Sequence, residues 1–228
     1  MKQLLFALFL GLSVSMVAQD KDANTLKNEG NESFKNKDYK GAYQAWAEAL
    51  TLLEAEGTVD DALIYNTGYA AFKAKKNKEA IPYFTKAIEL NYKDSKPYAF
   101  LAQVHMKMDD LDAMEKTLLD GLAKYNTDKT LKKLAGHCYL RKGLEFYNVG
   151  NDIKSAANNS GLNESDPEAF KAEYARADEE FKKALPFMEK SYEHDPSNDK
   201  ALKALQNIYT NLEMTDKANE IQTKLDAM

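Results

Sequence analysis

Side chains that could act as nucleophiles, bases or metal ligands are few in this sequence and lie far apart. The only histidines are His105, His137 and His194, and the only cysteine is Cys138. No HExxH, CxxC, GxSxG or glycine-rich phosphate loop occurs. His137 and Cys138 are adjacent, but neighbours on a helix point about 100° apart, so they cannot form a base–nucleophile pair. The sequence therefore predicts a protein that is not an enzyme, with no catalytic residue, no cofactor and no metal site.

The charged residues argue against a nucleic-acid partner. The formal net charge is -5, and only Arg141 and Arg176 among the 31 basic residues are arginine. Recognition of phosphates and base edges favours the forked guanidinium of arginine over lysine. We therefore expect a protein or peptide partner and no nucleic acid. A single cysteine also excludes a disulfide within the chain.

The first nineteen residues have the pattern of a signal peptide. Lys2 gives a short positive start, Leu4 to Val17 is almost wholly apolar, and cleavage is expected after Ala18 or Gln19. The apolar run of roughly 14 residues is shorter than the roughly 20 that a spanning helix needs. We expect an exported protein, periplasmic or secreted, with no membrane insertion after cleavage. A retained N-terminal anchor is the alternative.

The rest of the chain repeats every 34 residues. The residues Gly68, Ala80, Phe84 and Ala87 align at this offset with Ala102, Met114, Leu118 and Gly121. Small residues at two of these positions let antiparallel helices approach closely, and the large ones fill the space between units. A helical bundle without repeats would not return the same residue sizes at a fixed offset. The pattern predicts an all-α array of helix pairs.

The sequence resembles the tetratricopeptide-repeat (TPR) family over about residues 23–228. The first unit is the clearest, with Gly30, Ala42, Trp46 and Ala49 at the family's spacing. The resemblance implies an all-α TPR solenoid of about five helix-turn-helix units within a domain at residues 20–228. The extended fourth unit, with Ala184-Leu185-Pro186-Phe187 near its end and a closing repeat after it, resembles those of exported TPR proteins of certain Gram-negative bacteria. The expected units are 23–56, 61–94, 95–128, 129–198 and 199–228.

The fourth unit departs most from the repeat because it has about 70 residues. An insertion at about 149–166 contains Asn151 to Asp166, whose Asn-, Ser- and Gly-rich composition predicts a loop. Ser165 three residues before Glu168 predicts a capping box, with Pro167 in the first turn of a helix that runs to about His194. We therefore expect a long helical hairpin that stands out from the array.

In the TPR family the first helices of successive units line a concave groove. The family's groove positions carry a basic and aromatic strip on this acidic protein, which is what an acidic or C-terminal peptide would need. The candidate peptide-binding residues are Lys27, Asn31, Tyr65, Asn66, Tyr69, Lys96, Phe100, Gln103, His137 and Arg141. Phe34, Lys73 and Lys133 belong to the same strip.

Four of these residues resemble a carboxylate clamp. TPR proteins that bind the C-terminal carboxylate of heat-shock chaperones have Lys, Asn, Asn and Lys where this chain has Lys27, Asn31, Asn66 and Lys96. Phe100 stands where those proteins have Arg, and four extra residues after the first unit disturb the spacing. A true clamp and a less specific peptide groove both remain open.

Two classes of function follow. The first is a non-catalytic protein- or peptide-binding scaffold of the cell envelope that uses the concave groove. The second is a self-associating structural protein, in which the hairpin and the end of the array pack against a second copy as a homo-oligomer. An accessory subunit of an envelope complex is a further form of the first.

Cys138 and His105 fall on packing positions, so we expect a core cysteine and a satisfied interior histidine.

Overall fold

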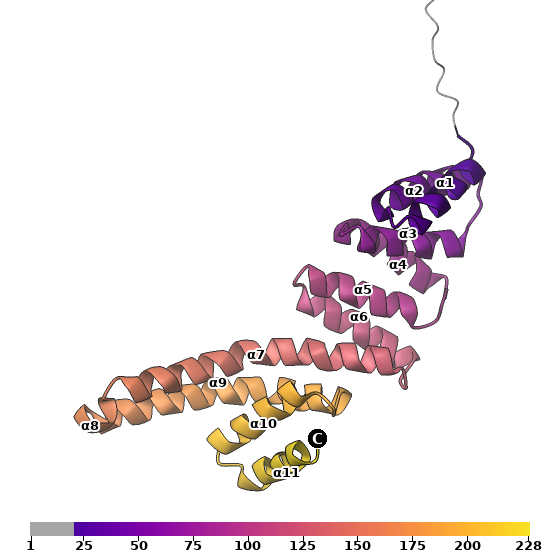
Figure 1. The fold of residues 1–228 in the computed structure, drawn as a ribbon. Coiled ribbons are helices and arrows are strands. Elements are labelled where there is room, and N and C mark those ends of the chain that lie inside the picture. Colours follow the sequence, from indigo (N-terminus) through magenta and orange to yellow (C-terminus); the bar gives the residue numbers. More distant parts are fainter. Residues whose placement is uncertain (1–20) are drawn as a thin grey trace, which may run out of the picture.

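The structure is a computed structural model that describes residues 21–228; the predicted signal peptide at residues 1–19 lies outside the described residues. The described part contains eleven α-helices and no strand, which confirms the predicted all-α TPR-like solenoid. Figure 1 shows successive helix pairs stacked one after another along the array. The pairs are α1 (Ala23–Lys35) with α2 (Tyr39–Ala55), α3 (Asp61–Lys73) with α4 (Asn77–Glu89), α5 (Lys96–Lys107) with α6 (Leu111–Lys124), α7 (Lys129–Asn159) with α9 (Pro167–His194), and α10 (Asp199–Asn211) with α11 (Thr215–Asp226). The short α8 (Leu162–Ser165) joins α7 to α9.

Aspartate side chains start several helices and also join neighbouring pairs. The carboxylates of Asp60 and Asp128 accept backbone N–H groups in the first turns of α3 and α7, at 2.9 and 2.8 Å. The first N–H groups of a helix have no partner within the helix, so these bonds stabilise its start. Each carboxylate also accepts a bond from the preceding pair, from Lys27 at 2.7 Å and from Ser95 at 2.6 Å.

Small residues allow the two helices of a pair to pack closely. Ala42 and Ala80 are fully buried where the repeat predicts a small side chain. Gly30 lies directly against Trp46, and a Cβ atom at Gly30 would stand 2.3 Å from Cδ1 of that ring. Close-packed interiors do not absorb such an overlap without a shift of the neighbouring atoms. The repeat of residue sizes therefore has the packing role that the sequence predicts.

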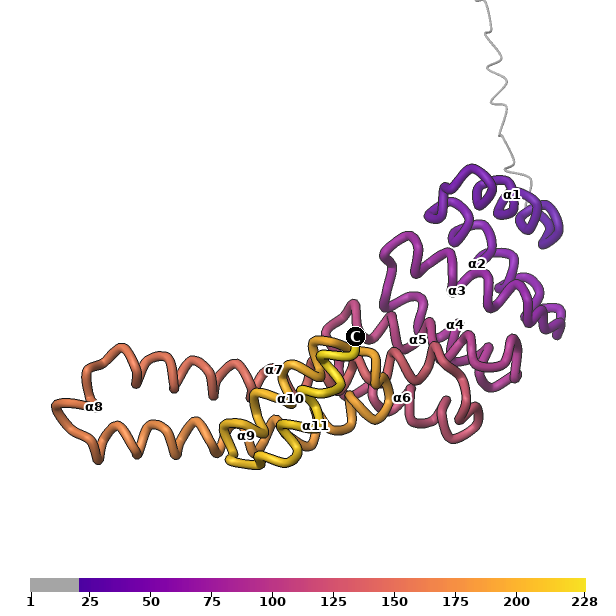
Figure 2. Tube along the Cα trace, turned by 60° about the horizontal axis from the view of Figure 1, so that its bottom comes forward, coloured from indigo at the N-terminus to yellow at the C-terminus, as the bar shows by residue number. Residues whose placement is uncertain are grey.

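The fourth pair is much longer than the others. α7 has 31 residues and α9 has 28. Figure 2 shows the distal part of both helices projecting from the array as a two-helix arm. The predicted helix from Pro167 to His194 is confirmed, but the loop predicted over Asn151–Asp166 is wrong, because α7 continues to Asn159 and α8 occupies much of the remainder.

Packing along the arm explains why a segment of loop-like composition is helical. A Cβ atom at Gly150 would stand 2.8 Å from the ring of Phe181, so the two helices touch closely there. Beyond it, Lys154 donates to Asn211 of α10 at 2.8 Å and lies 3.0 Å from the carboxylate of Asp178 in α9. These contacts hold α7 against α9 and α10 around residue 154. Tertiary contacts here override the weak local preference of the sequence.

The start of α9 differs from the prediction by one residue. The carboxylate of Asp166 accepts the N–H of Ala169 at 3.1 Å, so Asp166 is the N-cap. Ser165 instead donates its hydroxyl to the carbonyl of Gly161 at 3.0 Å. The predicted capping box with Ser165 is therefore wrong. Pro167 does occupy the first turn, where its missing N–H costs nothing.

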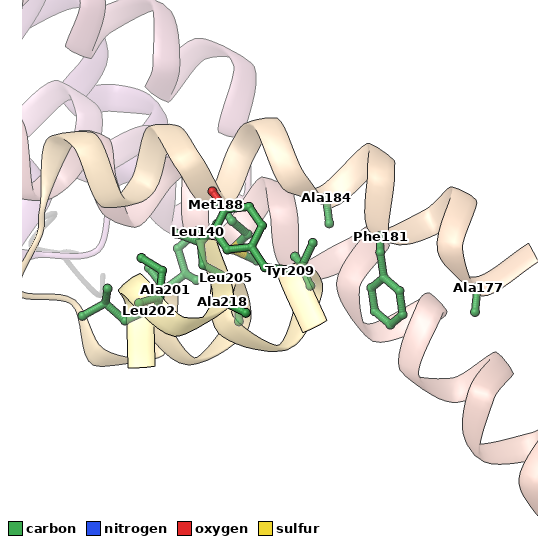
Figure 3. Close-up of a cluster of buried hydrophobic side chains, with 13 residues drawn as sticks. Leu140, Ala177, Phe181, Ala184, Met188, Ala201, Leu202, Leu205, Tyr209 and Ala218 are labelled. Carbon is green, nitrogen blue, oxygen red and sulfur yellow. The ribbon is translucent and has the colours of Figure 1, made fainter. Parts of the chain in front are cut away.

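The last pair packs against α9 and the near end of α7. Figure 3 shows Leu140 and Met188 of the fourth pair gathered with Leu205 and Tyr209 of α10, all of them buried, and Phe181 farther along the same cluster. Burial of this apolar surface, at about 25 cal/mol per Å², attaches the last pair to the array. In residues 21–228, no helix has the length and apolar character that crossing a membrane requires.

Candidate functional site

A hollow of about 490 Å³ opens where the first helices of four consecutive pairs meet. We call it the inner hollow. It is lined by Phe34 of α1, by Tyr65, Asn66 and Tyr69 of α3, by Lys93 before α5, by Lys96, Ala99, Phe100 and Gln103 of α5, and by Thr130 of α7. It follows that six of the ten predicted site residues lie together in one place: Tyr65, Asn66, Tyr69, Lys96, Phe100 and Gln103.

A second hollow of about 540 Å³ adjoins it, and Thr130 lines both. We call this the adjoining hollow, and the two together the inner groove. The other residues of the adjoining hollow are Met106, Lys129, Lys133, Leu134 and His137. The structure therefore places His137 on the same surface as the first six residues. Its pKa is lowered by partial burial and by the positive charges of Arg141 and Lys200, so the imidazole is neutral at neutral pH.

Aromatic rings form one wall of the inner hollow. The ring of Tyr69 lies 5.1 Å from that of Phe100 and 6.0 Å from that of Phe34. Phe100 is itself stacked on Phe84, with centroids 5.6 Å apart and planes at 12°. Phe84 is fully buried, so the wall is fixed to the core between α3 and α4. Burial raises the pKa of Tyr65 to about 12, which keeps its hydroxyl protonated as a hydrogen-bond donor.

Unpaired lysines surround this wall. Lys93, Lys96, Lys129 and Lys133 form no ion pair with any residue in 21–228. No Asp or Glu lines either hollow. The ammonium group of Lys93 lies 5.0 Å above the ring of Tyr65, close to the aromatic wall. The inner groove is thus a positively charged surface on a chain whose net charge is -5.

Three predicted residues line neither hollow. Lys27 forms an ion pair with Asp60 at 2.7 Å, and Asn31 is exposed on α1. Arg141 pairs with Asp109 at 2.5 Å, at the turn between α5 and α6. The charges of Lys27 and Arg141 are therefore already matched within the chain, and their ion pairs join one helix pair to the next.

Six lining residues were not predicted from the sequence: Lys93, Ala99 and Thr130 of the inner hollow, and Met106, Lys129 and Leu134 of the adjoining hollow. Lys93 lies in the connection between α4 and α5, with a positive φ of 58°, and thus outside the first helices whose positions predicted the groove. The feature of the sequence that could have predicted Lys93 is its place shortly before the first helix of a unit, from which a side chain can reach over the groove. Ala99 is buried and Thr130 is exposed, and neither has the basic or aromatic side chain from which the strip was predicted.

Cys138 and His105 lie away from the inner hollow. Cys138 is fully buried, and burial raises its pKa to about 11, so it is a core cysteine as predicted. His105 is only partly buried, and its Nδ1 atom has no hydrogen-bond partner among residues 21–228. The expectation of a satisfied interior histidine is therefore wrong. No group of three His, Cys, Asp or Glu side chains in this part of the chain could hold a metal ion.

Comparison with known proteins identifies the repeat. The family model described as tetratricopeptide repeat matches residues 71–138, which run from α3 into α7 and include most of the inner hollow. These residues form a tetratricopeptide-repeat segment of the chain. Proteins of this family are protein–protein interaction scaffolds, and their repeat fold is typically non-catalytic.

Among curated proteins, this chain is similar to parts of larger ones. Mitochondrial import receptor subunit TOM70 of Mus musculus is 35% identical over 134 residues, which are 54% of this chain and 22% of the receptor. DnaJ homolog subfamily C member 7 of Homo sapiens is 33% identical over 104 residues, or 46% of this chain and 20% of that protein. This chain thus spans about a fifth of the length of these curated relatives.

Solved structures share the fold along most of this chain. A TPR repeats protein from Bacteroides fragilis is 26% identical with a TM-score of 0.50, covering 83% of this chain and 98% of that one. YrrB, described as a TPR protein with an unusual peptide-binding site, is 18% identical with a TM-score of 0.52, covering 90% and 84%. The second likeness shows the fold alone.

Proposed function

We propose that this TPR protein is a non-catalytic scaffold that binds an acidic segment of a partner protein in its inner groove. One observation carries the proposal: the groove is lined by four lysines and by no carboxylate, although the chain is acidic overall. Separation of charge of this kind attracts an acidic partner and orients it before contact. The aromatic wall adds apolar area for close packing with the partner.

We also propose that the protein works in the cell envelope or outside the cell. The basis is the pattern of residues 1–19, which combines Lys2, an apolar run and small residues near Ala18. Mass spectrometry of the protein from fractionated cells tests this. A mature chain that begins at Gln19 or Asp20 outside the cytoplasm supports export, and a full-length chain in the cytoplasm contradicts it.

Both ends of the array favour a scaffold over self-association. The exposed side chains of α11 include Asn219, Gln222 and Thr223, and those of α1 include Asn28 and Glu32. Polar outer faces are typical of the terminal repeats that cap a solenoid. We expect size-exclusion chromatography with light scattering to give a monomer at all concentrations. A dimer that grows with concentration would favour the self-associating alternative.

Binding of acidic and basic peptides tests the groove directly. We expect fluorescently labelled acidic 12-residue peptides to bind and their charge-reversed counterparts not to bind. Replacing Lys93 and Lys96 together by Ala should weaken binding about tenfold or more, because charge-assisted hydrogen bonds contribute about 1.5–3 kcal/mol each. Binding should also weaken as salt rises, since exposed charges are screened beyond roughly 8 Å at physiological ionic strength.

A matched variant controls for the change in net charge. Lys78 and Lys116 are exposed on α4 and α6, the second helices of their pairs, and line neither hollow. Replacing both by Ala removes the same charge from another part of the surface. If this control weakens binding as much as the groove variant, the attraction is general and the groove is not the site.

A further inference from the structure

We propose that the inner hollow recognises an internal segment in which a large apolar side chain, best an aromatic ring, lies beside acidic residues. The ligand would then be a stretch within a partner chain and not its terminal carboxylate. This inference rests on the proposed function, since it names the feature that the same groove selects. It is carried by the arrangement of rings and charges around the hollow.

The rings of the hollow offer a receptor for an aromatic side chain. Tyr69 stands edge-on to Phe100, with planes at 71°, and Phe34 lies on its other side. All three side chains are only partly buried, although Phe100 is anchored on buried Phe84. Aromatic rings prefer such edge-to-face neighbours, so a further ring can add to the set with favourable geometry. A half-exposed apolar wall also gains free energy when a partner covers it.

The available charges lie beside this wall. Lys93 lies above Tyr65, and Lys96 is exposed in the first turn of α5, one turn before Phe100. Neither is paired with a carboxylate of residues 21–228. A ligand with its ring on the wall would place neighbouring residues near these two ammonium groups. Acidic residues of the ligand in those positions would neutralise the positive charges of Lys93 and Lys96.

The same arrangement is unsuited to a terminal carboxylate. Such a group needs converging charged donors to offset the loss of its water. Lys27 is held by Asp60, and the pair is fixed further because Asp60 also caps α3. Phe100 presents a ring instead of a donor, and the negative face of an aromatic ring does not favour an anion. The hollow therefore lacks the set of cations that a chain end would require.

Two side chains can hold the backbone of an extended segment. Asn66 lines the hollow and makes no side-chain hydrogen bond within residues 21–228, so both its carbonyl and its amide are available. Gln103, at the other side, uses one amide hydrogen on the carbonyl of Ala99 at 3.2 Å and keeps its oxygen free. An extended chain has unpaired N–H and C=O groups that these amides can satisfy.

Three fluorescent acidic peptides of equal length test the inference on the full mature chain. One has a central Phe and an amidated C-terminus, the second has the same sequence with a free C-terminus, and the third has Ala in place of Phe with an amide. We expect the first two to bind within about twofold of each other. The third should bind about tenfold more weakly, because burial of an aromatic ring contributes at least that factor.

Two variants locate the effect. Phe100→Arg removes a ring and adds a donor, so it should lower affinity for the Phe peptide and create a preference for the free C-terminus. Because Phe100 contacts the core, Tyr69→Ala is the second variant; it leaves the Phe100–Phe84 stack in place and should reduce the Phe-to-Ala ratio of affinities. Lys27→Ala should leave all three affinities unchanged, whereas Lys96→Ala should lower each one.

The outcomes separate this inference from the function on which it rests. A free C-terminus that binds tenfold more tightly than the amide overturns the internal-segment inference and leaves the peptide-binding groove intact. Equal binding of the Phe and Ala peptides overturns the aromatic anchor alone. No saturable binding of any acidic peptide contradicts the proposed function itself.

Discussion

At the scale of single residues, Lys27 shows how one ion pair removes a side chain from a binding surface. The four residues after the first unit, Gly57 to Asp60, place Asp60 at the start of α3 and within 2.7 Å of the Lys27 ammonium. Partial burial of Asp60 raises its pKa, but the bonds from Lys27 and the Leu63 N–H outweigh this, and the pKa is lowered overall. The folded protein therefore holds this carboxylate ionised.

A pH titration of stability checks the role of Asp60. A lowered folded-state pKa contributes stability above the unfolded pKa of about 4 and loses it as pH falls through the folded value. Asp60→Asn keeps a good N-cap and removes the charge, so it should cost up to about 1 kcal/mol at pH 7. Chemical denaturation should show this difference shrinking below about pH 4. A difference that stays constant from pH 7 to pH 3 would mean that the ion pair contributes nothing.

Cys138 should be inert in the native protein. Its thiol is fully buried, its Sγ lies 3.5 Å from the carbonyl of Leu111, and burial raises its pKa to about 11. Only the thiolate reacts readily with alkylating agents. Labelling with N-ethylmaleimide at pH 8 should be slow in buffer and complete in guanidinium chloride. Equal rates in both would place Cys138 on the surface.

At the scale of helices and turns, the four short pairs share one backbone feature. The turn inside each pair places one residue that is not glycine in the left-handed region: Lys37, Lys75, Asp109 and Glu213, with φ between 58° and 62°. This conformation costs a residue with a Cβ atom of the order of 1 kcal/mol, and glycine is the usual residue there.

Lys75→Gly should therefore stabilise the protein by about 0.5–1 kcal/mol, after the greater flexibility of glycine in the unfolded chain is included. Lys75 is exposed, so little packing is lost. Lys116→Gly, an exposed position inside α6, is the matched control and should destabilise by about 1 kcal/mol. The change in stability of both variants is measured from the midpoints of urea denaturation. If both variants lose stability equally, the left-handed turn is not strained.

Small core positions should be sensitive to added volume. Ala80 is fully buried where α4 crosses its neighbours, so Ala80→Leu should cost roughly 1–3 kcal/mol through overpacking. Lys78→Leu adds a similar side chain two residues away on the exposed surface and should change stability by less than about 0.5 kcal/mol. Thermal melting compares them. Equal melting temperatures for Ala80→Leu and the parent would contradict the alignment of the second unit.

These elements also show what the sequence could predict. Residue sizes at Gly30, Ala42 and Trp46 predict the helix pairs because steric fit at a close crossing leaves few alternatives. The far end of α7 could not be predicted in the same way. Its Asn- and Ser-rich composition is that of a loop, and it is helical because Gly150 and Lys154 contact residues distant in sequence. The amino-acid composition of a segment does not indicate which distant residues it will contact.

The candidate site also contains residues that the sequence could predict and residues that it could not. Tyr65, Asn66 and Phe100 follow from their positions on first helices, because a regular repeat places equivalent residues on one surface. The use of Lys27 and Arg141 in ion pairs, and the entry of Lys93 from a connection, depend on contacts between units. Whether the predicted residues bind a partner stays a prediction that the peptide experiments address.

At the scale of the whole molecule, the arm should limit where a protease can cut. α7 is helical to Asn159 with Ala157 buried, so the accessible backbone at the end of the arm is the segment from Ser160 to Asp166. Gly161 in this segment has no atom near the position of a Cβ. Brief treatment with subtilisin should first give two fragments that meet between residues 160 and 166. Earliest cutting inside α1 to α6 would contradict this description of the arm.

The length of the α7–α9 contact has a consequence for how the array comes apart. In a solenoid, stability is the sum of the stability of each unit and of the interfaces with its neighbours. The fourth unit has the most extensive internal interface and also contacts α5, α6 and α10. Among residues 21–228, the first unit contacts a neighbouring unit on one side alone. We therefore expect unfolding to begin at the ends of the array and to reach α7 and α9 last, so that the unit that departs most from the repeat contributes most to cooperative unfolding.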